Sequence, residues 1–169
     1  MRTNEYDELI KKLVVELKCP FSWLLIKAQM IRESGGNPKA KSSAGAIGLM
    51  QLMPSTIAIY QCENPEDPEQ NLKVGIQYMT YLFSQFRKEA PCERWKFALG
   101  AYNAGIGNIL MAQKACQAKK TIANVWDYVA QELRNFTGKN ATQTINYVKS
   151  IQDILIELLV SDNSDDVGV

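Results

Sequence analysis

One acidic residue, Glu33, stands where an apolar stretch meets a loop of small residues. Residues 21–34 are apolar on most of their circumference when they are read as a helix, which places Glu33 in the last turn. The negative end of the helix dipole and apolar neighbours such as Met30 would both raise the pKa of this carboxyl group. A general acid must hold its proton near neutral pH. Glu33 is therefore a candidate catalytic acid, and the alternative is an ordinary solvent-facing glutamate at a helix end.

The segment that follows is rich in small and polar residues and holds no second acid between Ser34 and Cys62. Its glycines permit tight or positive-φ backbone, and its hydroxyl and amide groups could line a polar cleft. Residues 46–53, AIGLMQLM, are too apolar to be wholly solvated. We therefore expect part of this loop to fold back onto the core, the alternative being a plain surface connection.

The chain contains no histidine, which excludes Ser-His and Cys-His catalysis and the common zinc sites. The four cysteines, Cys19, Cys62, Cys92 and Cys116, form no C-x-x-C pair. We expect buried free thiols, with one or two disulfides as the alternative. Neither a metal nor a cofactor is expected.

Length and composition fit one globular domain, because 169 residues with 46% hydrophobic side chains suffice for a core. The net charge of +1 and the lack of a basic run argue against a nucleic-acid partner. Residues 1–18 carry acids from Glu5 onward and no continuous apolar run, so they predict neither a signal peptide nor a membrane span.

Helical periodicity recurs along the chain, so the fold is expected to be mainly α with a central buried helix. A proline at 20 suits the start of the second helix, and the glycine pair at 35–36 should end it. A short β-hairpin is the most that residues 34–48 allow. Residues 161–169 read as an acidic, disordered tail after a domain of residues 1–160. Helices are expected at 9–17, 20–34, after Pro54, and at 71–86, 93–105, 107–118, 124–136 and 142–160.

Two motifs in order carry a resemblance to a known family. Residues 33–56, ESGGNPKAKSSAGAIGLMQLMPST, resemble the first motif of the soluble lytic transglycosylases, whose fold is related to goose-type lysozyme. Residues 98–109, ALGAYNAGIGNI, resemble that family's Ala-Tyr-Asn-Ala-Gly segment. The resemblance spans about residues 8–155 and implies a lysozyme-like fold. Without the first motif, the second would read equally well as a helix C-cap made by Asn and Gly.

A third motif is only partly present. The family usually has Glu-Thr-Arg, a variable residue and Tyr-Val, whereas residues 143–148 read QTINYV, so Gln143 and Ile145 replace the usual Glu and Arg. The resemblance makes Tyr147 a hydroxyl that contacts Glu33 or the substrate, the alternative being a core tyrosine. It makes Glu33 the catalytic acid and base, and the substrate-binding residues that it implies are Ser42, Gln51, Met53, Tyr102, Asn103 and Tyr147.

The activity that the resemblance implies is cleavage of the β-1,4 bond between N-acetylmuramic acid and N-acetylglucosamine in peptidoglycan glycan strands. Glu33 would act as acid and then as base, and the product would be a 1,6-anhydro-muramic acid end. A hydrolytic glycosidase usually needs two carboxyl groups, so the lack of acid after Glu33 favours the anhydro product. The alternatives are a lysozyme-type muramidase, including a phage endolysin, and an inactive cell-wall binding protein.

We expect a monomer that acts on the cell wall, in the periplasm. Because the N-terminus predicts no export signal, we expect one of two explanations. Either the protein reaches the cell wall by release of the kind that phage lysis proteins use, or the given sequence lacks its signal peptide.

Overall fold

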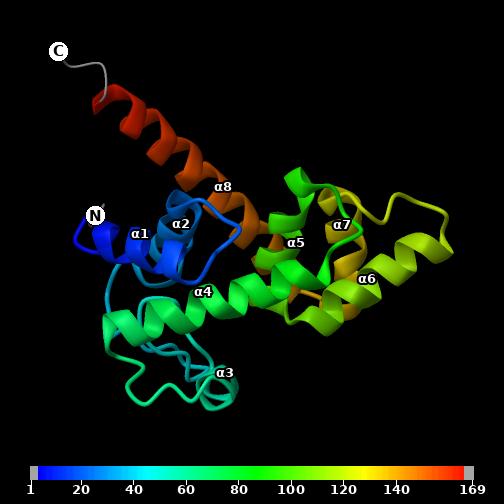
Figure 1. Cartoon of the computed structure of the whole chain (residues 1–169). Helices are drawn as coiled ribbons and strands as arrows, with labels where there is room; N and C mark the ends of the chain where they lie inside the picture. Colours follow the sequence, from blue (N-terminus) through cyan, green and yellow to red (C-terminus); the bar gives the residue numbers. More distant parts are fainter. Residues whose placement is uncertain (1–3, 166–169) are drawn as a thin grey trace. The chain divides into compact units, whose positions relative to one another are not determined.

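The computed structural model describes residues 4–165, which form eight helices joined by loops (Figure 1). Within these residues the only β-structure is two isolated bridges, from Ile47 to Lys41 and to Leu52. The prediction of a mainly helical fold with at most a small hairpin is confirmed. The helices are α1 (Asp7–Glu16), α2 (Trp23–Ser34), α3 (Pro54–Ile59), α4 (Pro68–Gln85), α5 (Pro91–Ala104), α6 (Ile106–Ala118), α7 (Trp126–Thr137) and α8 (Asn140–Asp165).

The described residues divide into two compact units, one of residues 4–78 with 151–165 and one of residues 79–150. The boundaries fall inside α4 and α8. The assignment of residues 1–160 to one catalytic domain stays a prediction. Of the predicted tail, residues 161–165 are helical as the end of α8, and residues 166–169 lie outside the described part.

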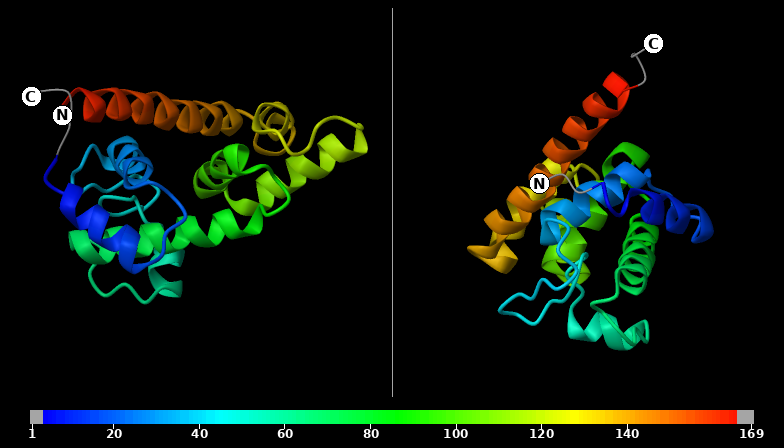
Figure 2. Two further views of the ribbon diagram at one scale, coloured as in Figure 1. Left: turned by 45° about the horizontal axis from the view of Figure 1, so that its top comes forward. Right: turned by 90° about the vertical axis from the view of Figure 1, so that its left-hand side faces the viewer.

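The first unit is built around α2, in which seven consecutive residues, 24–30, are buried. Helix α1 packs on α2 and buries Ile10 and Leu13 against it (Figure 2). The expected start of this helix at residue 20 is wrong by three residues. The Ser22 hydroxyl oxygen accepts a hydrogen bond from the N–H of Leu24 and so fixes the first turn there.

A buried lysine joins these two helices. Lys27 lies within the buried run of α2 and is only 3% exposed. Its ammonium group lies 2.7 Å from Asp7 Oδ2 on α1 and donates to Asn4 Oδ1 at 3.0 Å. A buried ammonium group needs such partners, because an unpaired charge away from water is strongly destabilising. The burial of α2 around Lys27 therefore depends on the carboxylate that α1 supplies.

The second unit has an aromatic core. The ring of Phe97 on α5 lies 5.3 Å from that of Phe86 and 5.7 Å, edge to face, from that of Trp126 on α7. Trp126 also covers Gly100, where a Cβ would clash with the indole. Glu93 Oε2 accepts a hydrogen bond from the backbone N–H of Trp126 at 2.8 Å, so a side chain of α5 caps the start of α7. Helices α6 and α7 pack against each other in the same unit (Figure 2).

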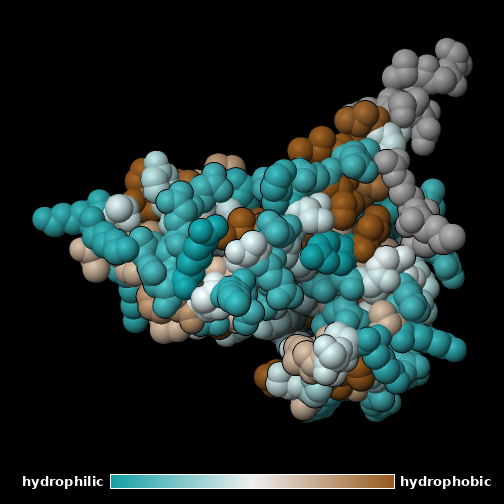
Figure 3. Space-filling view, turned by 180° about the vertical axis from the view of Figure 1, so that it is seen from behind, coloured by the Kyte–Doolittle hydropathy of each residue, from teal (hydrophilic) through white to brown (hydrophobic). Residues whose placement is uncertain are grey.

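The last turns of α8 leave apolar side chains in solvent. Ile156, Leu159 and Val160 are exposed at helical spacing, and Figure 3 shows hydrophobic surface beside this end of the chain. Within residues 4–165 no helix has both the length and the apolar character that a membrane span requires.

All four cysteines are free thiols, as expected. The expectation that they are buried holds for Cys116 alone. Cys92 is exposed, and Cys19 and Cys62 are half-buried, because these three lie in loops or in the first turn of α5 rather than on core-facing helix positions.

Candidate functional site

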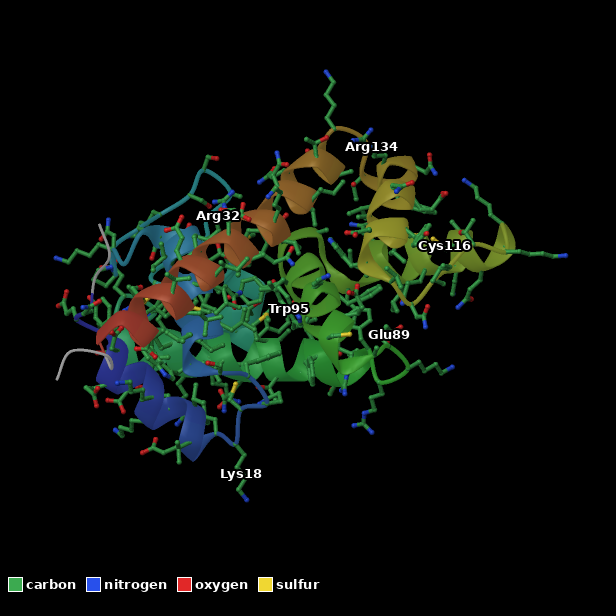
Figure 4. All side chains as sticks on the ribbon, turned by 90° about the horizontal axis from the view of Figure 1, so that it is seen from above. Lys18, Arg32, Glu89, Trp95, Cys116 and Arg134 are labelled. Atoms are coloured by element: carbon green, nitrogen blue, oxygen red, sulfur yellow. The ribbon has the colours of Figure 1, made fainter. Side chains whose placement is uncertain are left out.

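Glu33 occupies the last turn of α2 and is half-buried. Gly35 ends the helix with φ +61°, and its N–H donates to the carbonyl of Ile31 at 2.9 Å. The Ser34 hydroxyl accepts from the N–H of Gly36 at 3.2 Å. The predicted helix end is confirmed, and the chain leaves α2 directly after the candidate acid. Figure 4 labels Arg32, the residue before Glu33.

The loop after α2 is held by its own hydrogen bonds. Ser42 and Ala46 exchange two: the Ser42 N–H donates to the Ala46 carbonyl, and the Ser42 hydroxyl accepts from the Ala46 N–H, both at 3.0 Å. The N–H of Gly48 donates to the carbonyl of Ala40 at 2.9 Å. The exposed Ser42 is therefore fixed in position by the turn that it closes.

Gln51 braces the base of the same loop. Its backbone has φ +47°, and its side-chain amide nitrogen donates to the carbonyls of Ala40 at 3.1 Å and Gly48 at 3.0 Å. Both amide protons are thereby used. Only the amide oxygen of Gln51 is left to meet a ligand. Met53, two residues on, is 42% exposed at the start of α3.

Asn71 on α4, which the sequence did not single out, anchors this loop from outside. Its Oδ1 accepts from the N–H of Met50 at 2.7 Å, and its Nδ2 donates to the carbonyls of Ile47 at 3.0 Å and Pro65 at 2.7 Å. The side chain is fully buried. Three backbone groups of two loops thus depend on one amide, which periodicity alone could not reveal.

Two glycines allow the loop to lie close to α4. At Gly48, with φ +81°, a Cβ would collide with the Asn71 side chain and the Pro65 carbonyl. At Gly75 on α4, a Cβ would lie 2.6 Å from the Met50 side chain. Leu49, Met50 and Leu52 are buried as a result, so the predicted folding back of residues 46–53 onto the core is confirmed.

In the second unit, the predicted residues lie at the end of α5. Tyr102 is half-buried and Asn103 is exposed, two residues before Gly105 turns the chain with φ +84°. Asn103 Oδ1 accepts a hydrogen bond at 2.8 Å from the hydroxyl of Thr144 on α8, which is 2% exposed. Thr144 belongs to the third motif, but its role in holding Asn103 was not predicted.

A small polar pocket of about 150 Å³ opens beside Asn103. Gln143, at a position where the family usually has Glu, lines this pocket. Tyr147, one turn later on α8, is 2% exposed. The pocket is lined by Asn103, Ala104, Asn108, Thr137, Asn140, Gln143 and Thr144.

The predicted site residues thus fall in two sets. Glu33, Ser42, Gln51 and Met53 belong to the first unit, and the second unit holds Tyr102, Asn103 and Tyr147. Within the described part of the chain, no group of three or more Cys, Asp or Glu side chains is arranged to hold a metal ion.

Comparison with known proteins gives the family. Residues 16–125 match the family model described as Transglycosylase SLT domain, which includes the first two motifs and ends before the third. The membrane-bound lytic murein transglycosylase F of Maricaulis maris (strain MCS10) is 32% identical over 148 residues, covering 86% of this chain and 32% of the relative.

Solved structures agree in fold. The 70 kDa soluble lytic transglycosylase of Escherichia coli superposes with a TM-score of 0.68 at 26% identity, over 91% of this chain and 24% of that protein. A complex of the 70 kDa soluble lytic transglycosylase with bulgecin A gives a TM-score of 0.67 at 27% identity, over 89% and 23%. The chain spans about a third of the length of the curated relatives that it matches. On its sequence and its fold, the chain belongs to the Transglycosylase SLT domain family.

Proposed function

We propose that this protein is a lytic transglycosylase that cleaves the β-1,4 bond between N-acetylmuramic acid and N-acetylglucosamine in peptidoglycan. One observation carries the proposal: within the segment that matches the family model, Glu33 stands half-buried at the end of a buried helix, followed by a braced loop without another acid. The names of the curated relatives, lytic murein transglycosylases, support it.

The surroundings of Glu33 suit a carboxyl group that gives up and regains a proton. It lies at the carbonyl end of α2, where the helix dipole disfavours negative charge. Fully buried Met30 lies one turn earlier. Both features disfavour the charged form of the carboxyl group, which is the direction that proton donation in the first step of glycosidic cleavage requires.

The reaction needs no external nucleophile. Glu33 donates its proton to the glycosidic oxygen, and the bond from this oxygen to C1 of muramic acid breaks, with the muramic N-acetyl group sharing the developing positive charge. The Glu33 carboxylate then takes the proton of the muramic C6 hydroxyl, whose oxygen closes onto C1. The acid is regenerated and a 1,6-anhydro end is formed. A hydroxyl tethered within the sugar has the proximity advantage that a free water molecule lacks.

The remaining residues are proposed to hold the glycan strand. Asn103, oriented by Thr144, would hydrogen-bond a sugar substituent, and Ser42 would do so from the turn that it closes. The free amide oxygen of Gln51 and the exposed Met53 would line the cleft floor. Tyr102 would support the site wall, and the Tyr147 hydroxyl would contact the substrate.

The partner is accordingly the peptidoglycan glycan strand, and the place of action is the cell wall. A monomer suffices, since one chain carries every proposed group. The likeness to a transglycosylase solved with bulgecin A supports bulgecin A as a ligand of this chain also, which gives a binding test that needs no turnover.

Glu33→Gln tests the proposal, because it keeps the shape of the side chain and removes the transferable proton. Cleavage of purified cell wall should fall by about 100-fold to 10,000-fold. Glu63→Gln, at an exposed position in the same unit, is the matched control and should stay near the parent rate. Bulgecin A binding by the Glu33 variant would show that its cleft is intact. Near-parental cleavage by Glu33→Gln would overturn the assignment.

A further inference from the structure

The second unit holds a cavity that the proposed chemistry does not use. It has a volume of about 710 Å³. It is lined by the end of α4 and the loop that follows it, by residues 110–117 of α6, and by residues 123–124 before α7. Its walls carry three basic side chains and one acid: Arg87, Lys88, Lys114 and Glu89. Figure 4 labels Glu89, which belongs to the loop between α4 and α5.

These charges do not neutralise one another. Across the described residues, none of the four groups takes part in an ion pair. The Arg87 Nε–H is directed instead to the carbonyl of Ser84, at 3.0 Å. Charges of both signs on the cavity wall therefore remain available to a ligand.

Glu89 is held in place from beneath. Gln113 on α6 is only 8% exposed, and its amide nitrogen donates to Glu89 Oε1 at 2.7 Å and to the Ala123 carbonyl at 3.0 Å. The other carboxylate oxygen, Oε2, is out of reach of water and accepts no hydrogen bond. A carboxylate that has lost water on one side without gaining a donor is destabilised. The positive charge of a cationic ligand in the cavity would offset part of this cost, with the carboxylate left where Gln113 holds it.

We propose that this cavity binds a short peptide that carries both a free ammonium group and carboxylates, the chemistry of an uncross-linked peptidoglycan stem peptide. The ammonium group meets Glu89, and the carboxylates meet Arg87, Lys88 and Lys114. Charge-assisted hydrogen bonds of both signs fix the direction of the peptide. The choice of a stem peptide among zwitterionic peptides rests on the proposed function.

The probe is N-acetyl-L-Ala-γ-D-Glu-meso-diaminopimelate, whose one ammonium group is on the diamino acid. The full chain, labelled with ¹⁵N, is titrated with this peptide to millimolar concentration. Amide signals of residues 84–89, 110–117 and 123–124 should shift. Acetylation of the remaining ammonium group, or Glu89→Gln in the protein, should each raise Kd by about tenfold or more. The acetylated peptide and the Glu89→Gln protein, tested together, should raise Kd little further, because each change alone already removes the contact between the ammonium group and Glu89.

Two matched variants serve as controls. Glu132→Gln makes the same change outside the cavity, and Lys139→Gln is compared with Lys114→Gln. Both controls should keep Kd within about twofold of the parent value, while Lys114→Gln weakens binding. The proposal is overturned if the peptide shifts no signal around the cavity, or if the acetylated peptide binds the parent protein equally well. That second comparison needs no variant and so does not depend on how Glu89→Gln folds.

Cleavage of glycan strands stripped of peptide separates this inference from the proposed function. Strand cleavage without peptide binding would remove the peptide site and leave the enzyme assignment standing. Peptide binding without strand cleavage by the parent protein would remove the enzyme assignment and leave the peptide site standing. The stem peptide would then no longer be preferred over other zwitterionic peptides as the ligand.

Discussion

The side chain of Asn71 on α4 holds the backbone of Met50 in the loop that follows Glu33, with its Oδ1 2.7 Å from the Met50 nitrogen. The same side chain binds the carbonyls of Ile47 and Pro65. Asn71→Ala leaves these backbone groups unpaired in the interior. We expect the free energy of unfolding to fall by about 2–4 kcal/mol, measured by urea denaturation.

Asn135→Ala is the control for this change, because Asn135 is exposed and its one hydrogen bond is to a side chain, Glu132. It should alter stability by less than about 0.5 kcal/mol. Equal effects of the two variants would mean that Asn71 does not anchor the loop.

Gly48→Ala tests how closely the loop approaches α4. A Cβ there meets the Asn71 side chain and the Pro65 carbonyl, and the backbone has φ +81°. We expect a loss of about 2–4 kcal/mol in thermal or urea unfolding. Gly107→Ala is the matched control, because Gly107 lies in α6 with open space around its Cβ position. It should be neutral or stabilise by up to about 1 kcal/mol. A Gly48 variant as stable as the Gly107 variant would contradict the packing described.

The helices were predictable because helical periodicity and the residues that begin or end a helix are local features of the sequence. Gly35 ended α2 as expected, since a residue with φ +61° favours glycine. The predicted start of α2 at Pro20 was wrong. A proline suits a first helical turn, but the capping hydroxyl of Ser22 fixes the start three residues later. Residues 161–165 continue α8 where composition alone indicated disorder.

The contacts that hold the site were not predictable, because they join residues far apart in sequence. Asn71 and Thr144 both appear as unremarkable polar positions on helices, yet one holds Met50 and the other holds Asn103. Gln51 was expected to line a cleft, but its amide nitrogen donates both of its hydrogen bonds to backbone carbonyls of the loop. Spacing identifies candidate residues, whereas their partners require the fold.

Thr144→Val tests the support of Asn103. The Thr144 hydroxyl has one proton, and its shorter contact, 2.8 Å to Asn103 Oδ1 against 3.3 Å to the Asn140 carbonyl, shows where it is directed. If Asn103 binds the sugar, valine should lower kcat/KM for glycan cleavage by about threefold to tenfold. Combined with Asn103→Ala, Thr144→Val should have little added effect. Fully additive losses would show that the two residues act separately.

Tyr147→Phe separates a functional hydroxyl from a core tyrosine. The side chain is 2% exposed, so phenylalanine preserves its apolar packing. We expect kcat to fall by about tenfold, with unfolding free energy changed by less than about 1.5 kcal/mol. Unchanged kcat with lowered stability would make the third motif purely structural in this chain.

The products of digestion test the central claim, because Glu33 is followed by a loop without a second acid as far as Cys62. A lytic transglycosylase releases muropeptides that end in 1,6-anhydro-muramic acid, which lack a reducing group. Mass spectrometry of a complete cell-wall digest, before and after borohydride, reads this directly. We predict ends that weigh one water less than hydrolytic ends and that borohydride leaves unchanged. Predominantly reducible muramic acid ends would contradict the proposal and make the protein a lysozyme-type hydrolase.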